Sequence, residues 1–432
     1  KLKNTYQEAL PLGWWKAICE LLEQINWNEI LAIGLSSQVG TYLVDDKEVI
    51  GWSRNIGKKE LEWWKANYSK QKFVEEISMP HPEIISYPLP RLKYIKEHLK
   101  DVKKICQPKE YIIEKLTGEW VTDLYSWRGL ANLQSGSYSK FFLEELGMEE
   151  TMLPPMKYPH QLAGSTKELQ FSKNVLPAGI PVYVGLNDYY AGLLGMGIGK
   201  NGQAFDVTGT SEHLGVLQSE IETDTTLVSG PYINYNVHYG VTASSGPSIK
   251  YGLRLQSEPV FDMEKIAKEK PPVFLPYVKG ERAPIWNADA RGAFFGIEEN
   301  CSTDLMVYAV MEGVVFSLYH IYETMGKPEI SQITVSGGAA SIHCLNMLKA
   351  EMFDVPIEVV EESDVSALGA CMTAAVGLGW YSDYTQAAMQ WVKAAEKVIP
   401  TGKYREWFEK RYEIYKEFYM SIEPLYEKWK EL

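Results

Sequence analysis

The sequence predicts an α/β protein with two domains, and three observations support this fold class. The chain has 432 residues, of which 45% are apolar and 23% are charged, so it is long enough to form two hydrophobic cores. Helical and strand-like hydrophobic patterns alternate along its first part. Beyond Gly199 the pattern changes to short strands rich in Gly, Ser and Tyr, so we expect one domain over residues 1–198 and a second over residues 199–432.

The first domain opens with a helical pattern at Leu12–Gln24. The apolar run Glu29–Leu35 then has the character of a buried strand, and Thr41–Val44 is a second strand that ends in a turn at Asp45 and Asp46. Further helices of this domain are expected at Lys58–Lys72, Arg91–Lys104, Lys109–Leu116 and Ser139–Leu146.

The second domain contains helical patterns at Phe261–Lys268 and Leu305–Glu323. The strand Ile333–Ser336 runs into the small residues Gly337–Ser341 before another helix. Such a turn is typical of nucleotide sites, but it also occurs where a helix packs closely on a sheet. The last segment, Tyr404–Lys430, predicts an amphipathic helix that packs on this domain or on a partner subunit.

Composition excludes several classes of protein. Lys and Arg number 43 and Asp and Glu number 56, so the formal net charge is −13, and no basic stripe is present that would track nucleic acid. The five cysteines lie far apart without a C-x-x-C pair, which indicates reduced thiols and a cytoplasmic protein. The histidines lack metal-ligand spacing, which argues against a zinc site. No apolar run reaches the roughly 18 residues of a membrane span.

The residues that suggest a chemical reaction lie between Gly185 and Ser211. Asp188 follows the strand-like run Pro181–Val184 and precedes an apolar helix, where it is either a helix N-cap or a catalytic base. The later Gly209-Thr-Ser211 ends a second strand, and its small residues allow backbone amides to approach a phosphate, although an ordinary β-turn has the same composition. An acid and a phosphate-sized turn together suggest phosphoryl transfer.

Three groups of motifs extend over nearly the whole chain. They are Gly185-x-x-Asp188 with Gly209-Thr-Ser211, Leu275-Pro-Tyr-x-x-Gly-Glu-Arg-x-Pro284 with Ala290-Arg-Gly-Ala-Phe-Phe-Gly296, and Gly337-Gly-Ala339 with Ala367-Leu-Gly-Ala-Cys-Met-Thr-Ala-Ala375. Together they resemble the FGGY carbohydrate kinases of the actin-like ATPase superfamily. This resemblance implies two ribonuclease-H-like domains with an interdomain cleft that holds ATP and a sugar.

The resemblance also implies roles for individual residues. Asp188 matches the general base that takes a proton from the sugar hydroxyl, and ATP with Mg²⁺ is the implied phosphoryl donor. On the substrate side, Gln38 and Tyr189 accompany Asp188. We further expect Glu281, Arg282 and Arg291 to form a buried lattice of ion pairs. The implied nucleotide site consists of Gly209, Thr210, Ser211, Gly246, Gly337, Gly338 and Ala339.

Two departures from the family pattern limit what the resemblance implies. The family's first Asp-x-Gly-Thr phosphate loop is missing, and we expect it to lie upstream of Lys1. The polar sugar ligands that follow the family's Gln are replaced by Val39-Gly-Thr41 after Gln38. We therefore expect a kinase for an unspecified small sugar or polyol, with a homodimer as the family's usual assembly and the metal ligands unassigned. The alternative is a catalytically impaired sugar- or nucleotide-binding protein that keeps the fold.

Overall fold

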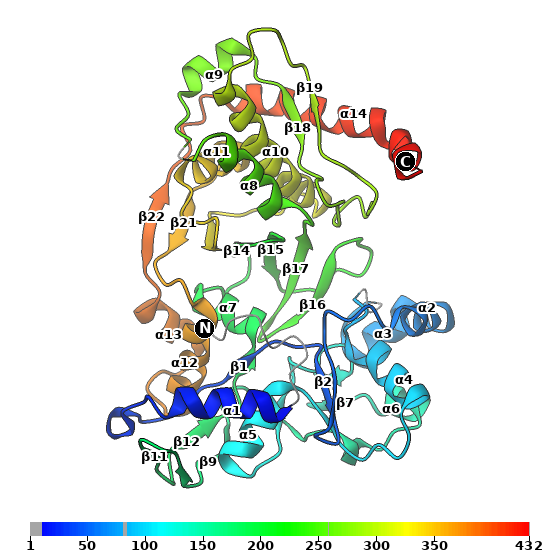
Figure 1. Cartoon of the computed structure of the whole chain (residues 1–432), viewed down its shortest axis with the longest axis vertical. Coiled ribbons are helices and arrows are strands. Elements are labelled where there is room, and N and C mark those ends of the chain that lie inside the picture. The colour runs from blue at the N-terminus through cyan, green and yellow to red at the C-terminus, as the bar shows by residue number, and fades with distance from the viewer. Residues whose placement is uncertain (1–10, 81–83, 258, 432) are drawn as a thin grey trace. The chain divides into compact units, whose positions relative to one another are not determined.

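The computed structural model describes residues 11–80, 84–257 and 259–431. The chain divides into two compact units, and the dividing points are not those of two uninterrupted halves (Figure 1). The first unit consists of Lys1–Gly199, Ser229–Asn236 and Asp364–Trp391, and the second of Lys200–Val228, Val237–Ser363 and Val392–Leu432. Two short segments of the second half of the sequence therefore belong to the first unit.

Helices of the first unit are separated by many very short strands. Its helices are α1 (Pro11–Leu22), α2 (Lys58–Asn67), α3 (Lys70–Ile77), α4 (Pro88–His98), α5 (Pro108–Thr117), α6 (Lys140–Leu146), α7 (Asp188–Gly195), α12 (Val365–Gly377) and α13 (Tyr384–Trp391), with 3-10 turns at Trp27–Glu29 and Glu150–Met152. Its strands are β1 (Ser36–Ser37), β2 (Tyr42–Val44), β3 (Glu48–Ile50), β4 (Ile105–Cys106), β5 (Thr122–Asp123), β6 (Ala131–Asn132), β7 (Ser137–Tyr138), β8 (Met156–Lys157), β9 (Leu162–Ser165), β10 (Leu169–Gln170), β11 (Val175–Leu176), β12 (Pro181–Tyr183), β13 (Leu186–Asn187) and all but the first residue of β16 (Val228–Tyr232).

The predicted helices of this unit are present, but one of them is broken. The segment expected as a single helix at Lys58–Lys72 forms α2 and α3, because Ser69 is extended and its Oγ accepts a hydrogen bond from the backbone N–H of Lys72 at 3.2 Å. Serine at this position satisfies a donor at the start of the next helix and thereby favours a new helix over a continuous one.

The predicted buried strand at Glu29–Leu35 is wrong. Only Ile33 of this run pairs, through a single bridge to Val182, and the first true strand of the region is β1. The run follows the segment that contains β12 and β13 but pairs with it only in part: the N–H of Ile33 donates to Pro181, and the carbonyl oxygen of Leu35 accepts from the N–H of Leu186 at 3.2 Å. Its residues are half-buried or exposed. A continuous ladder needs a partner strand beside every residue, and hydrophobicity alone cannot show whether one is present.

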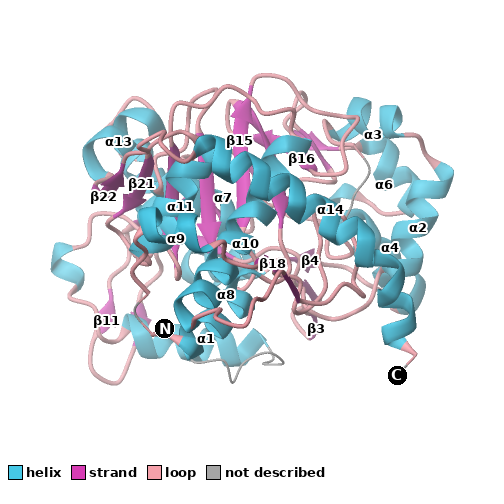
Figure 2. Cartoon of the chain, turned by 90° about the horizontal axis from the view of Figure 1, so that it is seen from above, coloured by secondary structure: helices cyan, strands magenta, loops and turns pink. Residues whose placement is uncertain are grey.

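The second unit is built on a twisted mixed sheet. Six of its strands lie in the order β17-β15-β14-β20-β21-β22, with β14, β20 and β21 mutually parallel (strands magenta in Figure 2). Its helices are α8 (Ser245–Leu255), α9 (Met263–Glu269), α10 (Thr303–Thr324), α11 (His343–Phe353) and α14 (Arg405–Lys430). Its strands are β14 (Ala204–Thr208), β15 (His213–Gln218), all but the first two residues of β17 (Tyr235–Val241), β18 (Val273–Leu275), β19 (Ala293–Phe295), β20 (Ile333–Gly337), β21 (Ile357–Val360) and β22 (Ala394–Val398).

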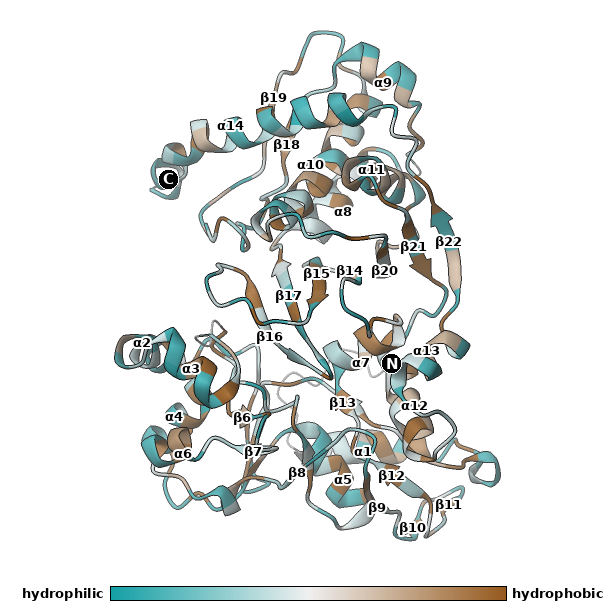
Figure 3. Cartoon of the chain, turned by 180° about the vertical axis from the view of Figure 1, so that it is seen from behind, coloured by the Kyte–Doolittle hydropathy of each residue, from teal (hydrophilic) through white to brown (hydrophobic). Residues whose placement is uncertain are grey.

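Helix α10 is the core helix of the second unit. By length and composition it is the one described helix that could cross a membrane, but 78% of its apolar window is buried inside the protein. It contacts α8, α11 and α14. Figure 3 shows α14 as mostly hydrophilic and β21 as hydrophobic. The buried face of α14 carries Arg411, whose guanidinium pairs with the buried Glu312 of α10 at 2.5 Å. The predicted amphipathic helix is therefore confirmed, and it packs on this unit.

Candidate active site

Asp188 is the first residue of α7 and is exposed. The N-cap is the preceding Asn187, whose side-chain oxygen accepts a hydrogen bond from the backbone N–H of Tyr190 at 2.8 Å. The carboxylate of Asp188 accepts from the adjacent N–H of Tyr189, also at 2.8 Å. The capping role that the sequence left open for Asp188 therefore belongs to its neighbour. Its carboxylate has no capping role in α7.

The electrostatic surroundings of Asp188 favour a base. Loss of hydration raises the pKa of this carboxyl above its ordinary value of 3.8, and the hydrogen bond from the Tyr189 N–H opposes that rise. A carboxylate with a raised pKa binds a proton more strongly, which suits proton abstraction from an alcohol.

Close packing of α7 against α12 fixes the position of Asp188. A Cβ atom at Gly195 of α7 would lie 1.9 Å from the carbonyl oxygen of Val365, and one at Gly369 would lie 1.9 Å from that of Ala191. These two glycines therefore let the helix backbones touch. Near the start of α7, Ser366 donates a hydrogen bond from Oγ to the carbonyl oxygen of Asp188 at 2.8 Å. A helix from the far end of the sequence thus holds the residue in place.

The structure brings Gln38 to the same edge as Asp188. In the parallel pair formed by β1 and β13, Ser37 lies opposite Asn187, so the next residue of each strand leaves the pair at the same end. Gln38 is exposed, and its Nε2 donates to the hydroxyl of Thr41 at 3.0 Å. Tyr189 is half-buried beside Tyr190, with ring centroids 5.9 Å apart. All three predicted substrate-side residues therefore belong to the first unit.

A buried polar network that the sequence analysis missed supports this edge. Gln107 accepts from the backbone N–H of Gly40 at 2.8 Å and donates to the carbonyl oxygen of Ser126 at 2.8 Å. Nearby, the ammonium of Lys109 pairs with Asp123 at 2.5 Å in the fully buried interior. Lys109 begins the helix expected at Lys109–Leu116, but a lysine at a helix start gives no sign of burial, so the sequence held no signal for this network.

The predicted phosphate turn is a β-hairpin in the second unit. Strands β14 and β15 pair antiparallel up to Val207 and His213, and Gly209, Thr210 and Ser211 lie in the connection between them. Within the described part of the chain, the backbone N–H groups of these three residues donate no hydrogen bond to another residue. Consecutive backbone N–H groups without protein acceptors are suited to binding an anion.

The predicted adenosine turn is joined to this hairpin through Thr208. The backbone N–H of Gly338 donates to the carbonyl oxygen of Thr208 at 3.2 Å, and that of Ala339 donates to its hydroxyl at 2.9 Å. Gly337 has φ of +104°, and a Cβ atom there would lie 2.1 Å from the same carbonyl oxygen. Glycine is therefore required at this position by both backbone conformation and space.

Gly246 completes the connected set at the start of α8. Its N–H donates to the carbonyl oxygen of Thr210 at 3.2 Å, and a Cβ atom on it would lie 2.4 Å from the carbonyl oxygen of Gly209. The seven residues predicted for the nucleotide are thus neighbours in one unit, although they come from three separate stretches of sequence. They are Gly209, Thr210, Ser211, Gly246, Gly337, Gly338 and Ala339.

A buried ion triad below the hairpin was not predicted. Lys349 of α11 contacts Asp206 at 2.5 Å and Glu212 at 2.7 Å, and all three side chains are at most 1% exposed. Burial and the neighbouring Glu212 raise the pKa of Asp206 to about 8, whereas both acids raise the pKa of Lys349. Two acids facing one ammonium with a proton retained between them leave little net charge inside the protein.

The ion-pair lattice expected for Glu281, Arg282 and Arg291 is wrong. Within the described residues these side chains form no salt bridge with one another. Glu281 instead accepts from the backbone N–H groups of Ala243 at 2.5 Å and Arg282 at 2.8 Å, because buried backbone donors need an acceptor. Burial raises the pKa of Glu281 to about 7. Arg282 donates to the hydroxyl of Ser211 at 3.2 Å.

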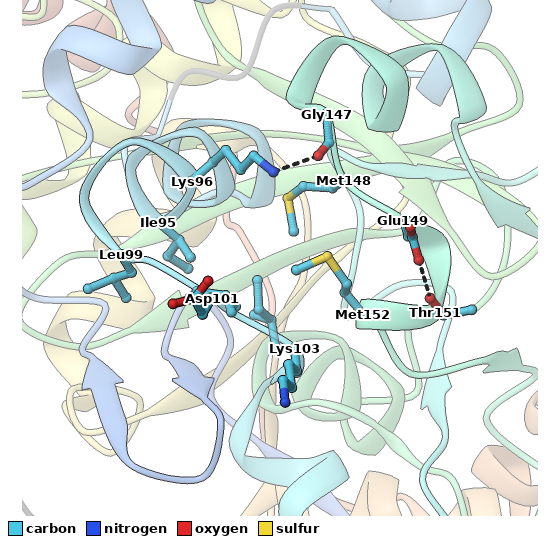
Figure 4. A pocket seen from close by; sticks show the side chains of 12 residues that line it. Ile95, Lys96, Leu99, Asp101, Lys103, Gly147, Met148, Glu149, Thr151 and Met152 are labelled. Carbon is cyan, nitrogen blue, oxygen red and sulfur yellow. Dashed lines mark hydrogen bonds between the residues drawn. The ribbon is translucent and has the colours of Figure 1, made fainter.

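Two other hollows contain none of the predicted site residues. One of about 570 Å³ lies in the first unit between the end of α4 and the Gly147–Met152 segment, where Lys96 donates to the carbonyl oxygen of Gly147 (Figure 4). The other, of about 510 Å³, lies beside α9 and α11 in the second unit. Neither is lined by Asp188 or by a residue of the predicted nucleotide site.

The first unit thus presents an acid at a helix start, and the second unit presents a hairpin with consecutive free N–H groups joined to a glycine turn; phosphoryl transfer uses features of both kinds. Comparisons with known proteins identify the class further. The N-terminal domain of the FGGY family of carbohydrate kinases matches residues 3–195, and the C-terminal domain of the same family matches residues 192–378. The chain belongs to the FGGY family of carbohydrate kinases.

Similar proteins agree with this assignment. The chain is 27% identical to the xylulose kinase of Staphylococcus xylosus over 96% of this chain and 92% of that protein. It is 27% identical to the gluconokinase of Bacillus subtilis over 77% of this chain and 69% of that protein. Among solved structures, the xylulose kinase of Lactobacillus acidophilus superposes with a TM-score of 0.79 at 24% identity over 96% of this chain and 90% of that one. The predicted actin-like ATPase fold is confirmed.

Proposed function

We propose that this protein transfers the γ-phosphoryl group of ATP to a hydroxyl group of a small sugar or polyol, with Asp188 as general base. The observation that carries the proposal is the position of Asp188: it begins α7 with a raised pKa, and Asn187 takes the capping role. The relatives named xylulose kinase, gluconokinase and glycerol kinase support a small polyhydroxylated substrate.

The proposed reaction needs one proton acceptor. The substrate oxygen attacks the γ-phosphorus, the bond from that phosphorus to the β,γ-bridging oxygen breaks, and ADP leaves with the electron pair of that bond. Asp188 takes the proton that the attacking hydroxyl loses. Gln38 and Tyr189 are proposed to orient the substrate from the same unit. The remainder of the rate enhancement comes from positioning and charge neutralisation.

Nucleotide binding is assigned to the second unit. The three N–H groups of Gly209, Thr210 and Ser211 are proposed to bind phosphate oxygens, since they donate to no other described residue. Gly337 and Gly338 are exposed, and a Cβ atom at Gly338 would meet nothing within 4 Å, so this turn offers a flat backbone surface for adenosine. We accordingly propose residues 1–198 as the sugar side and residues 199–432 as the nucleotide side.

Mg²⁺ is the implied metal of this chemistry, and it would neutralise phosphate charge. The acids that flank the hairpin, Asp206 and Glu212, are at most 1% exposed and are paired with Lys349, so they do not fit as ligands. Mg²⁺ commonly keeps several waters and binds through substrate phosphates. We therefore propose that phosphate oxygens and water supply most of its ligands.

The five cysteines are free thiols, and we propose a cytoplasmic protein on this ground.

The test is sugar-dependent ADP formation by the whole protein with ATP and Mg²⁺, screened over sugars, polyols and sugar acids. Asp188→Asn should lower the rate with the best substrate at least a hundredfold, because general base catalysis is worth about 10²–10⁴-fold. Asp101→Asn is the matched control, since it makes the same change at an exposed position of the first unit. Unchanged turnover by Asp188→Asn would exclude the base assignment. Ligand binding without turnover by the unaltered protein would favour the impaired alternative.

A further inference from the structure

A hollow of about 430 Å³ lies beside the phosphate hairpin in the second unit and has an unusual lining. The seven residues that line it are Thr210, Pro247, Lys250, Tyr251, Arg254, Val278 and Lys279. Three of these carry a positive charge and none carries a negative one, in a protein whose net charge is −13. A local excess of this sign attracts anions.

The three cations are exposed and have no acidic partner. Within the described residues, Lys250, Arg254 and Lys279 take part in no salt bridge. Most other basic residues on α9 and α14 do have one, for example Lys265 with Glu269 at 3.9 Å and Lys410 with Glu406 at 3.4 Å. The charge of the hollow is therefore not cancelled within the protein.

Backbone geometry places these cations next to the hairpin. Pro247, Lys250 and Arg254 share one face of α8, and at 1.5 Å per residue Arg254 lies about 12 Å along the axis from Gly246. The backbone N–H of Gly246 donates a hydrogen bond to the carbonyl oxygen of Thr210. Across the hollow, the backbone N–H of Lys279 donates to the hydroxyl of Ser244 at 2.9 Å, which fixes this loop beside the start of α8.

The acids nearest in sequence to the hairpin do not counteract this charge. Asp206 and Glu212 are buried and face Lys349. A fourth cation, Arg282, donates to the hydroxyl of Ser211 on the hairpin itself. Because Thr210 of the hairpin also lines the hollow, the N–H donors of the hairpin and the cations of the hollow are neighbours.

We propose that Lys250, Arg254 and Lys279, together with Thr210, form an oligophosphate subsite that continues the phosphate hairpin along α8. Lys250 and Arg254 lie about 6 Å apart along α8, and together with the hairpin donors beside Gly246 the groups extend over about 12 Å of the helix, which matches a chain of several phosphates better than a single phosphate ion. Two ligands carry such a chain: the triphosphate of the nucleotide donor and free inorganic polyphosphate. Assignment to the nucleotide rests on the proposed kinase function, whereas the subsite itself does not.

The test compares two variants of the whole protein that remove the same charge. One is Lys250→Gln/Arg254→Gln/Lys279→Gln, and the other is Lys265→Gln/Lys268→Gln/Lys410→Gln, whose residues lie exposed on α9 and α14 of the same unit. Binding of tripolyphosphate and of ATP is measured by calorimetry at low and high NaCl, and the KM for ATP is measured with the best sugar. Circular dichroism and thermal melting confirm that both variants are folded.

We expect the subsite variant to bind tripolyphosphate at least tenfold more weakly than the unaltered protein, and the control to stay within twofold. Salt should weaken tripolyphosphate binding by the unaltered protein more than binding by the subsite variant, because screening acts on the removed charges. If the Kd and the KM for ATP both rise in the subsite variant, the subsite is assigned to the nucleotide. If both stay unchanged while tripolyphosphate binding weakens, it is assigned to free polyphosphate. Equal tripolyphosphate affinity in all three proteins overturns the proposal. Tripolyphosphate binding without any sugar-dependent turnover would instead contradict the kinase assignment alone.

Discussion

Replacement of Lys349 by Met should destabilise the second unit strongly. Lys349 is 1% exposed and lies 2.5 Å from Asp206 and 2.7 Å from Glu212. Its removal leaves two buried acids without a cation, and the loss of one partner of a buried pair costs about 3–5 kcal/mol. At about 2–4 °C per kcal/mol for a folding unit of this size, the melting temperature should fall by about 6–20 °C.

The destabilisation caused by Lys349→Met should increase with pH. Because the folded pKa of Asp206, about 8, exceeds its ordinary value of 3.8, this group contributes stability that is fully present below about pH 4 and is lost as the pH rises through about 8. Without the ammonium of Lys349, the Asp206 carboxylate that forms as the pH rises has no cation beside it. The difference between Lys349→Met and the unaltered protein should therefore be larger at pH 8 than at pH 5.

Calorimetric melting and urea unfolding at both pH values measure this difference. Lys397→Met is the matched control, because Lys397 is 48% exposed and its 3.4 Å pair with Glu358 should be worth less than about 1 kcal/mol. The triple variant Asp206→Asn/Glu212→Gln/Lys349→Met should recover part of the loss, since no charge is then left buried. A loss below about 1 kcal/mol for Lys349→Met, or one that is equal at pH 5 and pH 8, would refute this account of the triad.

Two further substitutions test the packing around the nucleotide side. Glu281 has a folded pKa of about 7, against an ordinary value of 4.5. Its contribution to the free energy of unfolding is therefore present below about pH 4.5 and is lost as the pH rises through 7. Relative to Glu281→Gln, the free energy of unfolding of the unaltered protein, measured in urea, should fall by up to about 3 kcal/mol between pH 5 and pH 8. A pH-independent difference between the two proteins would contradict the raised pKa. Gly337→Ala should weaken ADP binding and lower the melting temperature, because a Cβ atom would lie 2.1 Å from the carbonyl oxygen of Thr208 at φ of +104°. Gly338→Ala, which meets nothing within 4 Å, should bind ADP normally, and equal effects of the two substitutions would argue against the clash.

Local sequence patterns predicted most of the helices, but they predicted fewer of the helix and strand boundaries and of the strand-pairing partners. The helices α5, α6 and α10 follow from hydrophobic spacing and helix-terminal residues. The strand expected at Glu29–Leu35 is absent because the run pairs with its neighbouring segment only at isolated residues, and the helix expected at Lys58–Lys72 is divided at Ser69. In each case the backbone hydrogen bonds decided the outcome, and the hydrophobic pattern does not specify their partners.

The sequence by itself determined the family and the fold class, because the motifs that carry them are residue types at short spacings. The chemistry of Asp188 and of the glycine-rich turns stays a prediction from the same motifs. Tertiary structure alone decided that Asn187 and not Asp188 caps α7, and that α12, far along the chain, fixes α7 in place. It also decided that Lys349 meets two acids more than 130 residues away and that three unpaired cations gather beside Thr210. Burial and charge pairing between distant segments follow from how the chain folds back on itself, and no local pattern encodes them.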